Sequence, residues 1–469
     1  MDEYRTVYLK DEAFYIPRRY VIDRFIGQGS YGVVVAAKDI ITGELVAIKK
    51  NKGIFSTAGT NGKTQCRSIL SQKRILRELK LLIHLQHPNI VNVKEVFIPQ
   101  NYDTFCDIYF VTELMEADLR DILCSDQTLT EEHIQYFLFQ LLLSVNYMHS
   151  ANVLHRDIKP ENILINSDCQ LKICDLGLAR GIDFELNPTM STNYVQTRWY
   201  RAPELLLNNP TVSKQTDMWS VGCIFAELMN REVLFKGKSP TDQIKKIVSK
   251  LGKPDPREVH GTDSAIDYLN KMIPDQEGIK DWSQVFPGMS ALAIDLLLKM
   301  LEFNYEKRIS ASEALRHEYF ASLFDPAAIT LCPTLFDFKY EDGLDNLPPD
   351  SEVIKKLSYK TLCEYVEASR DQDTFDDDMD EGDEEEASSQ QTENSSMSMT
   401  PGDHLYYQNN ESDATGLAPG ARIAGKQQVD STTAAAEHKS SSFIQKVRSF
   451  LSGSTTSSSS TTTARGKSV

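Results

Sequence analysis

Short apolar runs dominate the first part of the chain. Residues 20–29, 32–39, 44–50 and 107–114 are rich in Val, Ile, Tyr and Phe, and glycine-containing turns separate the first three runs. Runs of this length between turn residues predict a sheet of short strands. Over residues 69–85 the apolar positions instead recur at spacings of three, four and seven, which predicts one helix ending before Pro88.

Helical patterns dominate from Asp118 onward. Thr130 precedes Glu131-Glu132-His133 and is expected to cap a long helix that runs to about His149. Residues 219–229 are almost continuously apolar, which predicts a buried helix. A strand-rich part followed by a helix-rich part indicates two lobes with a cleft between them.

The composition changes after residue 369. Acidic, hydroxyl and small residues replace aliphatic ones, with an acidic run at residues 371–386, so we expect residues 370–469 to be disordered. Residues 443–451 form one apolar island in this tail. Two interpretations stay open for it: docking on a partner, or a transient helix without a role.

Charge and cysteine content restrict the class of protein. The net charge of −17 argues against nucleic acid as the main partner, because nucleic acid binding needs basic surface. The eight cysteines form no CxxC pair, and free thiols fit a reducing compartment, so we expect a cytoplasmic and nuclear protein. We expect neither a secretory signal peptide nor a membrane span, because no apolar stretch approaches about 20 residues.

A glycine-rich loop and a lysine are the first candidates for phosphate chemistry. Gly27-x-Gly29-x-x-Gly32-x-Val34 lies between two predicted strands. A dinucleotide site would need a helix after the glycines, whereas residues 33–35 continue as strand. Lys49 lies on the next strand and Glu78 on the following helix, and the alternative for Lys49 is a solvated edge lysine.

The strongest signal is His155-Arg156-Asp157-Ile158-Lys159-Pro160-Glu161-Asn162, followed by Asp175-Leu176-Gly177 and Ala202-Pro203-Glu204. These motifs, in this order, resemble the catalytic loop, the metal-binding motif and the end of the activation segment of protein kinases. The resemblance covers residues 20–369 and implies the two-lobed α+β kinase fold. It implies an N-terminal extension at 1–19, an N-lobe at 20–113, a C-lobe at 114–320 and a C-terminal extension at 321–369 that wraps back onto the N-lobe.

The resemblance also implies a role for each motif residue. Asp157 accepts the substrate proton, and Lys159 neutralises the transferring phosphoryl group and marks a Ser/Thr kinase. Lys49, paired with Glu78, holds the ATP phosphates, and Asn162 and Asp175 bind Mg²⁺. Asp217 is expected to anchor the catalytic loop, and Arg308 to pair with Glu204. The residues implied to contact ATP are Ile26, Gly27, Gln28, Gly29, Ser30, Tyr31, Gly32, Val33, Val34, Ala47, Lys49, Thr112, Glu113 and Met115.

The stretch before Ala202 narrows the resemblance to mitogen-activated protein (MAP) kinases. Thr192-Asn193-Tyr194 precedes Val195-Gln196-Thr197-Arg198-Trp199-Tyr200-Arg201, which resembles the dual-phosphorylation lip of that family. The resemblance implies activation by an upstream dual-specificity MAP kinase kinase, reversal by phosphatases, and substrates with Ser-Pro or Thr-Pro sites. The arginines expected to bind the two phosphates are Arg77, Arg156 and Arg180 for Thr192, and Arg198 and Arg201 for Tyr194.

Several positions depart from the family pattern. Asn193 stands at the middle of the lip, Leu176 replaces the usual Phe, and residues 51–64 are an insertion that we expect to form a surface loop. Asp325 matches the first acid of the family's docking patch, but Ala328 and Ile329 stand where further acids are usual, and Asp168 is a candidate for a neighbouring acidic patch. We therefore expect basic docking peptides to bind weakly. Cys174 is either a reactive thiol or a small buried side chain, and Thr400-Pro401 is a hypothetical autophosphorylation site.

Three rival interpretations remain at this stage. A pseudokinase would lack Lys49, Asp157 or Asp175, all of which are present. Another Ser/Thr kinase would not be switched through Tyr194. A nucleotide-binding oxidoreductase is disfavoured because strand, not helix, follows the glycine loop.

Overall fold

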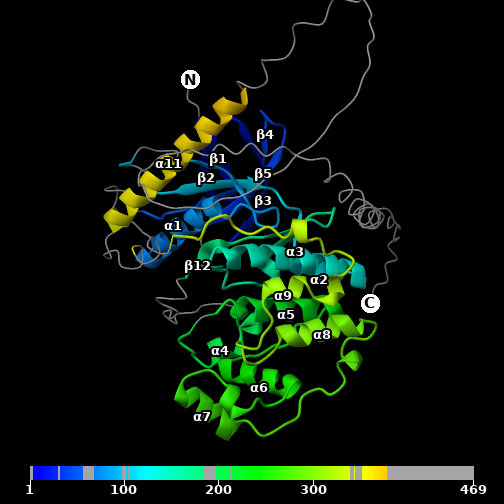
Figure 1. The fold of residues 1–469 in the computed structure, drawn as a ribbon. Coiled ribbons are helices and arrows are strands. Elements are labelled where there is room, and N and C mark those ends of the chain that lie inside the picture. Colours follow the sequence, from blue (N-terminus) through cyan, green and yellow to red (C-terminus); the bar gives the residue numbers. More distant parts are fainter. Residues whose placement is uncertain are drawn as a thin grey trace, which may run out of the picture. The chain divides into compact units, whose positions relative to one another are not determined.

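The computed structural model, shown in Figure 1, describes residues 4–29, 32–55, 68–97, 102–103, 105–182, 197–211, 213–337, 343 and 351–377, without the side chains of 351 and 367–377. The chain divides into two units, residues 1–368 with 444–469, and residues 369–443. The described part of the second unit is residues 369–377, the end of one helix, and every other feature discussed below lies in the first unit.

A five-stranded antiparallel sheet forms the N-lobe. Its strand order is β3 (Tyr20–Gln28), β4 (Val33–Asp39), β5 (Leu45–Asn51), β7 (Ile108–Glu113) and β6 (Val93–Phe97). Four of these strands were predicted from apolar runs, and β6 was not. Helix α1 (Ile69–His84) begins after Ser68, whose hydroxyl accepts a hydrogen bond from the Ser71 amide. The predicted helix over residues 69–85 is thus confirmed.

The N-terminal extension is an ordered hairpin rather than an unstructured leader to the sheet. Strands β1 (Tyr4–Leu9) and β2 (Glu12–Pro17) pair around Lys10 and Asp11, which both have positive φ as a tight two-residue hairpin turn requires. Phe14 and Ile16 are fully buried against Val35, Ile48 and Val111 of the large sheet. The hairpin therefore covers one face of that sheet.

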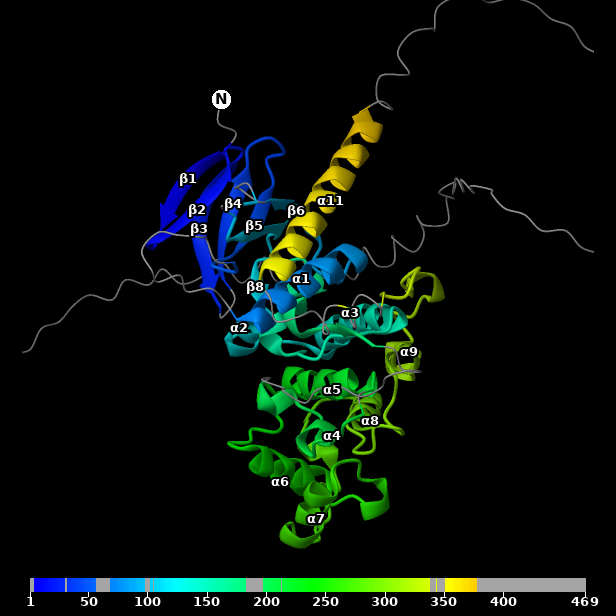
Figure 2. The ribbon, with the colours of Figure 1, turned by 90° about the vertical axis from the view of Figure 1, so that its left-hand side faces the viewer.

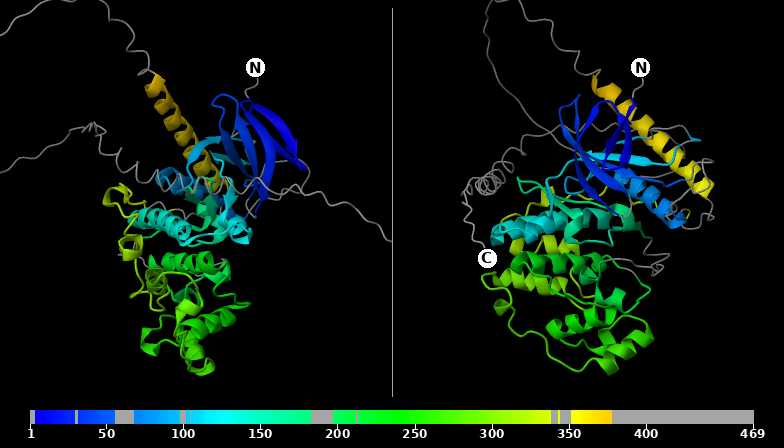
Figure 3. Two further views of the ribbon diagram at one scale, coloured as in Figure 1. Left: turned by 90° about the vertical axis from the view of Figure 1, so that its right-hand side faces the viewer. Right: turned by 180° about the vertical axis from the view of Figure 1, so that it is seen from behind.

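The C-lobe is mainly helical (Figure 3). Its helices are α2 (Leu119–Cys124), α3 (Glu131–Ser150), α4 (Pro203–Leu206), α5 (Gln215–Asn230), α6 (Pro240–Leu251), α7 (Asp263–Met272), α8 (Ala291–Met300) and α9 (Ala311–Leu315). Thr130 caps α3 as predicted, in a capping box completed by His133. Helix α5 is buried along most of its length, which confirms the helix predicted over residues 219–229.

Short strands and 3₁₀ turns shape the segment that carries the kinase motifs. The strands are β8 (Ala117–Asp118), β9 (Val153–Leu154), β10 (Ile163–Ile165), β11 (Leu171–Ile173) and β12 (Arg180–Gly181). The 3₁₀ turns are η1 (Pro160–Asn162), η2 (Leu176–Leu178), η3 (Arg198–Tyr200), η4 (Pro256–Glu258), η5 (Trp282–Gln284), η6 (Glu318–Phe320) and η7 (Pro326–Ala328). The pairs β8–β10–β11 and β9–β12 fix the loops between them. Elements of two or three residues are too short to show a periodic pattern, so the sequence did not predict them.

The part of helix α11 (Ser351–Asp377) that belongs to the first unit packs on the N-lobe beside α1 (Figure 2). Ile354 and Leu362 are fully buried in one apolar cluster with residues of α1, and the Tyr365 hydroxyl donates to the Val93 carbonyl at 3.3 Å. The predicted return of the extension onto the N-lobe is confirmed. The helix continues to Asp377, past residue 369 where the composition changes, and no Gly or Pro interrupts the sequence before Gly382.

The rest of the predicted tail, including residues 443–451 and Thr400, lies outside the described residues. Most of the predicted insertion at residues 51–64 does so too, although Ile54 and Phe55 are described and buried. Within the described residues, no helix combines the length and apolar character needed to cross a membrane.

Candidate active site

Strand β5 presents Lys49 on the face of the sheet that α1 covers. Side chains alternate along a strand, so Val46 and Ile48 are buried on the hairpin side while Ala47 and Lys49 face the other way. Lys49 Nζ lies 2.5 Å from Glu78 Oε1 on α1 and 4.0 Å from Asp175 Oδ1. Burial opposes the charge of Lys49, but these two carboxylates outweigh it and raise the pKa of the ammonium group. The predicted Lys49–Glu78 pair is formed.

The predicted adenine site lies along the same sheet face. Val34 stands opposite Lys49 in the β4–β5 pair, and Ala47 stands opposite Thr112 in the β5–β7 pair. The Thr112 hydroxyl donates to the Glu113 carbonyl at 3.2 Å, and Met115 is buried just beyond. The structure therefore brings these predicted residues together, while Ser30 and Tyr31 lie outside the described residues.

The three glycines of the loop are needed for different reasons. A Cβ atom on Gly32 would lie 2.0 Å from the Lys50 carbonyl oxygen, whereas Gly27 and Gly29 have open space around them. The Gly29 amide donates to the Gly32 carbonyl at 2.9 Å and closes the turn between β3 and β4. Gly32 is thus required by the close approach of two strands, and Gly27 and Gly29 leave room above the backbone for a phosphate group.

Asp217, buried near the start of α5, holds the catalytic loop in place. Its carboxylate accepts hydrogen bonds from the amides of His155 at 3.0 Å and Arg156 at 2.9 Å, and lies 2.9 Å from His149 Nε2. Burial alone would raise the pKa of Asp217, but His149 and these hydrogen bonds lower it overall. The predicted anchoring role is confirmed. The contribution of His149 was missed, because a single histidine in an apolar helix carries no motif.

The catalytic loop brings Asp157, Lys159 and Asn162 together. Lys159 Nζ lies 2.6 Å from Asp157 Oδ2, and Asn162 Nδ2 donates to the same oxygen at 3.1 Å and to the Asp157 carbonyl at 2.8 Å. Arg156 has φ 69°, a left-handed conformation that turns the chain so that these side chains converge. Burial raises the pKa of Asp157, although Lys159 opposes the shift.

Asp175 lies next to Asn162, where the metal site was predicted. The Cys174 amide donates to the Asn162 carbonyl at 3.0 Å, and Asp175 has φ 60°. One carboxylate and one amide oxygen are too few for a metal site made of protein alone, and the described residues hold no cluster of three or more His, Cys, Asp or Glu side chains. They fit Mg²⁺, which commonly takes one or two protein ligands and completes its shell with water and phosphate oxygens.

The two residues next to Asp175, Cys174 and Leu176, are both placed by the structure. Cys174 is half-buried, and the loss of solvent around its thiol raises the thiol pKa well above its usual range, which disfavours a reactive thiol. Leu176, in place of Phe, is fully buried in the cluster that includes Leu79 of α1. Leu176 therefore keeps this position in the apolar core.

The predicted phosphate-binding arginines are placed on the segments around the activation lip. Arg77 is buried on α1 beside Glu78, Arg156 Nη1 lies 3.5 Å from the Leu178 carbonyl, and Arg180 stands opposite Leu154 in the β9–β12 pair. Arg198 and Arg201 flank η3, where Arg198 Nη1 donates to the Lys238 carbonyl at 3.3 Å. Thr192 and Tyr194 lie outside the described residues.

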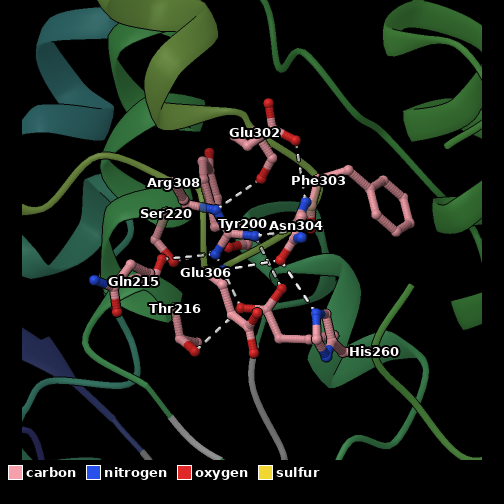
Figure 4. A network of polar contacts seen from close by, with 11 residues as sticks. Tyr200, Gln215, Thr216, Ser220, His260, Glu302, Phe303, Asn304, Glu306 and Arg308 are labelled. Carbon is pink, nitrogen blue, oxygen red and sulfur yellow. Dashed lines mark hydrogen bonds and ion pairs between the residues drawn. The ribbon is translucent and has the colours of Figure 1, made fainter. Parts of the chain in front are cut away.

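A buried polar network ties the end of the activation segment to the C-lobe core (Figure 4). Arg308 makes a two-pronged ion pair with Glu204, at 2.9 and 3.0 Å, and also donates to the Gln215 and Glu302 carbonyls. The Ser220 hydroxyl donates to the Tyr200 carbonyl at 2.8 Å. The predicted Arg308–Glu204 pair is thus confirmed, within a network larger than the pair.

The two predicted docking acids are engaged in local turns. Asp325 Oδ1 accepts a hydrogen bond from the Ala327 amide at 2.9 Å and caps η7. Asp168 Oδ1 accepts one from the Gln170 amide at 3.0 Å. Ala328, three residues after Asp325, is exposed, and it stands where the family carries a further acid.

Comparisons with known proteins agree with this geometry. Residues 20–320 match the protein kinase domain family. Extracellular signal-regulated kinase 1 of Dictyostelium discoideum is 42% identical over 362 residues, which cover 77% of this chain and 65% of that protein. Mitogen-activated protein kinase 3 of Arabidopsis thaliana is 44% identical, with 71% of this chain and 86% of that protein covered. Mitogen-activated protein kinase spm1 of Schizosaccharomyces pombe is 43% identical, covering 73% and 79%.

Proposed function

Because this chain belongs to the protein kinase family, and within it to the MAP kinases, we propose that it is a proline-directed kinase switched on by phosphorylation of Thr192 and Tyr194. Family membership makes it a Ser/Thr protein kinase that uses ATP and acts on protein substrates. The proposal adds the Ser-Pro or Thr-Pro preference, the dual switch, an upstream dual-specificity MAP kinase kinase and opposing phosphatases. It also places the enzyme in the cytoplasm and nucleus, without a nucleic acid partner.

The single observation that carries the proposal is the assembled set of charged groups. Lys49 is paired with Glu78 at 2.5 Å and faces Asp175, while Asp157, Lys159 and Asn162 converge on the next loop. Phosphoryl transfer is catalysed mainly by positioning and by neutralising charge, and these residues supply both.

The residues divide the work according to their chemistry. Lys49, held by Glu78, carries the positive charge that binds nucleotide phosphates. Lys159 and Asn162 both contact Oδ2 of Asp157, and we propose that Oδ1 receives the hydrogen bond of the substrate hydroxyl. The carboxylate then takes the proton as the hydroxyl oxygen attacks, and Lys159 stabilises the charge that develops on the transferred group.

Mg²⁺ is the proposed cofactor, with Asn162 and Asp175 as its protein ligands. When bound, it neutralises phosphate charge. The left-handed backbone at Asp175 orients the carboxylate, and Gly177 leaves only 3.2 Å between an added Cβ atom and Asp175 Oδ1. A larger residue at position 177 would therefore crowd this ligand.

Peptide phosphorylation tests the proposal. The purified, doubly phosphorylated protein is incubated with Mg²⁺ and γ-labelled ATP, together with paired peptides that differ only in Ser-Pro against Ser-Ala. We expect labelling of the Ser-Pro peptide to exceed labelling of its partner at least about tenfold, the discrimination given by one well-fitted pocket. Equal labelling of the two peptides would contradict the proposed proline preference. The absence of labelling of any protein or peptide would contradict the proposed kinase activity.

A weak acidic docking site is a separate part of the proposal. Asp325 and Asp168 each bind a backbone amide, and exposed Ala328 adds no charge. We expect a basic docking peptide to bind only in the micromolar range or weaker, as few charge pairs at an exposed surface contribute little. Peptide titration checks this, and tight binding that disappears in Asp325→Ala would contradict it.

A further inference from the structure

Arg120, on the short helix α2, makes a set of contacts that no sequence motif predicted. Its Nε donates to Glu161 Oε1 at 3.2 Å, its Nη1 donates to Glu227 Oε1 at 2.7 Å, and its Nη2 donates to the Tyr200 hydroxyl at 2.7 Å. The Tyr200 hydroxyl in turn donates to Glu227 Oε2 at 2.6 Å. All three guanidinium nitrogens are therefore engaged by residues from three other segments.

Two of these partners, Glu161 and Tyr200, belong to segments that the family resemblance implies contact the substrate. Glu161 stands between Lys159 and Asn162 in the catalytic loop, two residues from the group proposed to contact the transferred phosphoryl. Tyr200 belongs to the segment between the activation lip and Ala202, in η3 with Arg198 and directly before Arg201. The guanidinium thus joins the catalytic loop to the segment after the activation lip, the two segments implied to form the acceptor site.

The charges show what Arg120 does there. Glu227 is 1% exposed, and a buried carboxylate without a cation is costly. Glu161 is 42% exposed and adds a second negative charge. One arginine therefore neutralises one of two carboxylates and fills the space between them. A guanidinium from another molecule would find the same hydrogen-bond acceptors if Arg120 were absent.

We propose that Arg120 is a specificity-determining residue: it occupies, from within the chain, an acidic subsite that would otherwise bind an arginine of the substrate. As a consequence, basic residues before the phosphorylated Ser or Thr of a substrate do not raise kcat/KM. The position just after the acceptor is taken by the proline of the proposed function, on which this inference rests. Removing the internal arginine opens the subsite to a substrate arginine.

Kinetics with a positional peptide library tests the inference. Wild type and Arg120→Ala are compared on Ser-Pro peptides in which each position before the acceptor holds either Arg or Ala. We expect an Arg/Ala ratio of kcat/KM near one for wild type, and a rise of about tenfold or more at one position for Arg120→Ala, as one ion pair to a buried carboxylate would give. An unchanged ratio in Arg120→Ala would overturn the inference.

Matched variants separate this role from a purely structural one. Arg120→Lys keeps the positive charge, so its Arg/Ala ratio of kcat/KM is expected to rise only slightly. When Arg120→Ala is combined with Glu161→Gln, the ratio is expected to rise less than in Arg120→Ala alone. Because Arg120→Ala leaves Glu227 unpaired, we also measure its melting temperature with and without the selected arginine peptide. Stabilisation by that peptide and not by its alanine partner is expected, and equal stabilisation would contradict the inference.

Failure of the proposed function gives a different result. If wild type labels no Ser-Pro peptide, the kinase proposal fails, while fluorescence anisotropy of the same peptides still measures the subsite without turnover. Tighter binding of the arginine peptide by Arg120→Ala than by wild type is the expected outcome there. Equal affinity of both proteins for both peptides would contradict the inference about Arg120, whether or not the protein is a kinase.

Discussion

Gly32 and Gly29 are three residues apart in one loop, yet their environments differ. An added Cβ atom on Gly32 would lie 2.0 Å from the Lys50 carbonyl oxygen, and nothing lies within 4 Å of one on Gly29. We predict that Gly32→Ala destabilises the N-lobe by about 1–3 kcal/mol, the usual cost of overpacking, and forces β4 and β5 apart. Thermal unfolding checks this, with Gly29→Ala as the control. Equal melting temperatures for the two variants would contradict it.

The pKa of Asp157 predicts the acid side of the pH–rate profile. Burial raises this pKa, and the carboxylate must be deprotonated to accept a proton. Activity is therefore expected to fall with decreasing pH at values above about 3.9, the ordinary pKa of Asp. Lys159 lowers the pKa of Asp157, so Lys159→Met should move this acid limb to higher pH. A limb that stays in place or moves to lower pH in Lys159→Met would exclude Asp157 as the titrating group.

At the scale of elements, α11 stabilises the N-lobe through a few buried side chains. Ile354 and Leu362 are fully buried, while the neighbouring Val353 is 38% exposed. We predict that Ile354→Ala and Leu362→Ala each lower the free energy of unfolding by about 2–5 kcal/mol, as other large-to-small core substitutions do. Chemical denaturation measures this, and Val353→Ala serves as the matched control. A loss in the control as large as in the other two would show that the helix is not packed through this face.

The same scale shows which elements the sequence could predict. Helix α1 and strand β5 are long enough for periodicity to reveal them, and the catalytic loop is revealed by its motif residues. Strands β9 and β12, of two residues each, carry no such signal, because their pairing joins residues distant in sequence. The β1–β2 hairpin is paired locally, but its turn, Lys10-Asp11, is not one of the dipeptides typical of hairpin turns. Helix α11 extends past the predicted boundary since composition marked the change at residue 369, whereas the backbone meets no helix breaker until Gly382.

Among the site residues, too, those within a sequence motif could be predicted and those without one could not. Lys49, Glu78, Asp157, Asn162 and Asp175 were predicted from motifs, and the structure brings them together. Arg120 could not be predicted, since its partners come from residues 161, 200 and 227 and meet only in the folded chain. Charge pairs between distant segments leave no pattern along the sequence.

At the scale of the whole molecule, the proposed switch links the two lobes. Arg77 lies on α1 next to Glu78, and Arg156 lies in the catalytic loop next to Asp157. A phosphate bound by arginines on both elements would fix Lys49 relative to Asp157. We predict that phosphorylation of both Thr192 and Tyr194 raises kcat/KM at least about a hundredfold, since misplacement of such groups costs that much. Thr192→Ala and Tyr194→Phe, treated with an upstream dual-specificity kinase, are the controls. Full activation of either variant would refute the dual switch.

The most direct test of the central claim measures transfer of the γ-phosphate by the doubly phosphorylated protein and by its Asp157→Asn variant. Both proteins are expected to bind ATP with Mg²⁺ equally well, because Lys49, Asn162 and Asp175 are unchanged. We predict that the doubly phosphorylated protein with Asp157 intact labels a Ser-Pro peptide and that its Asp157→Asn variant does so about 10²–10⁴ times more slowly, the usual contribution of a positioned base. Equal rates for the two proteins, or ATP binding without labelling by either, would contradict it.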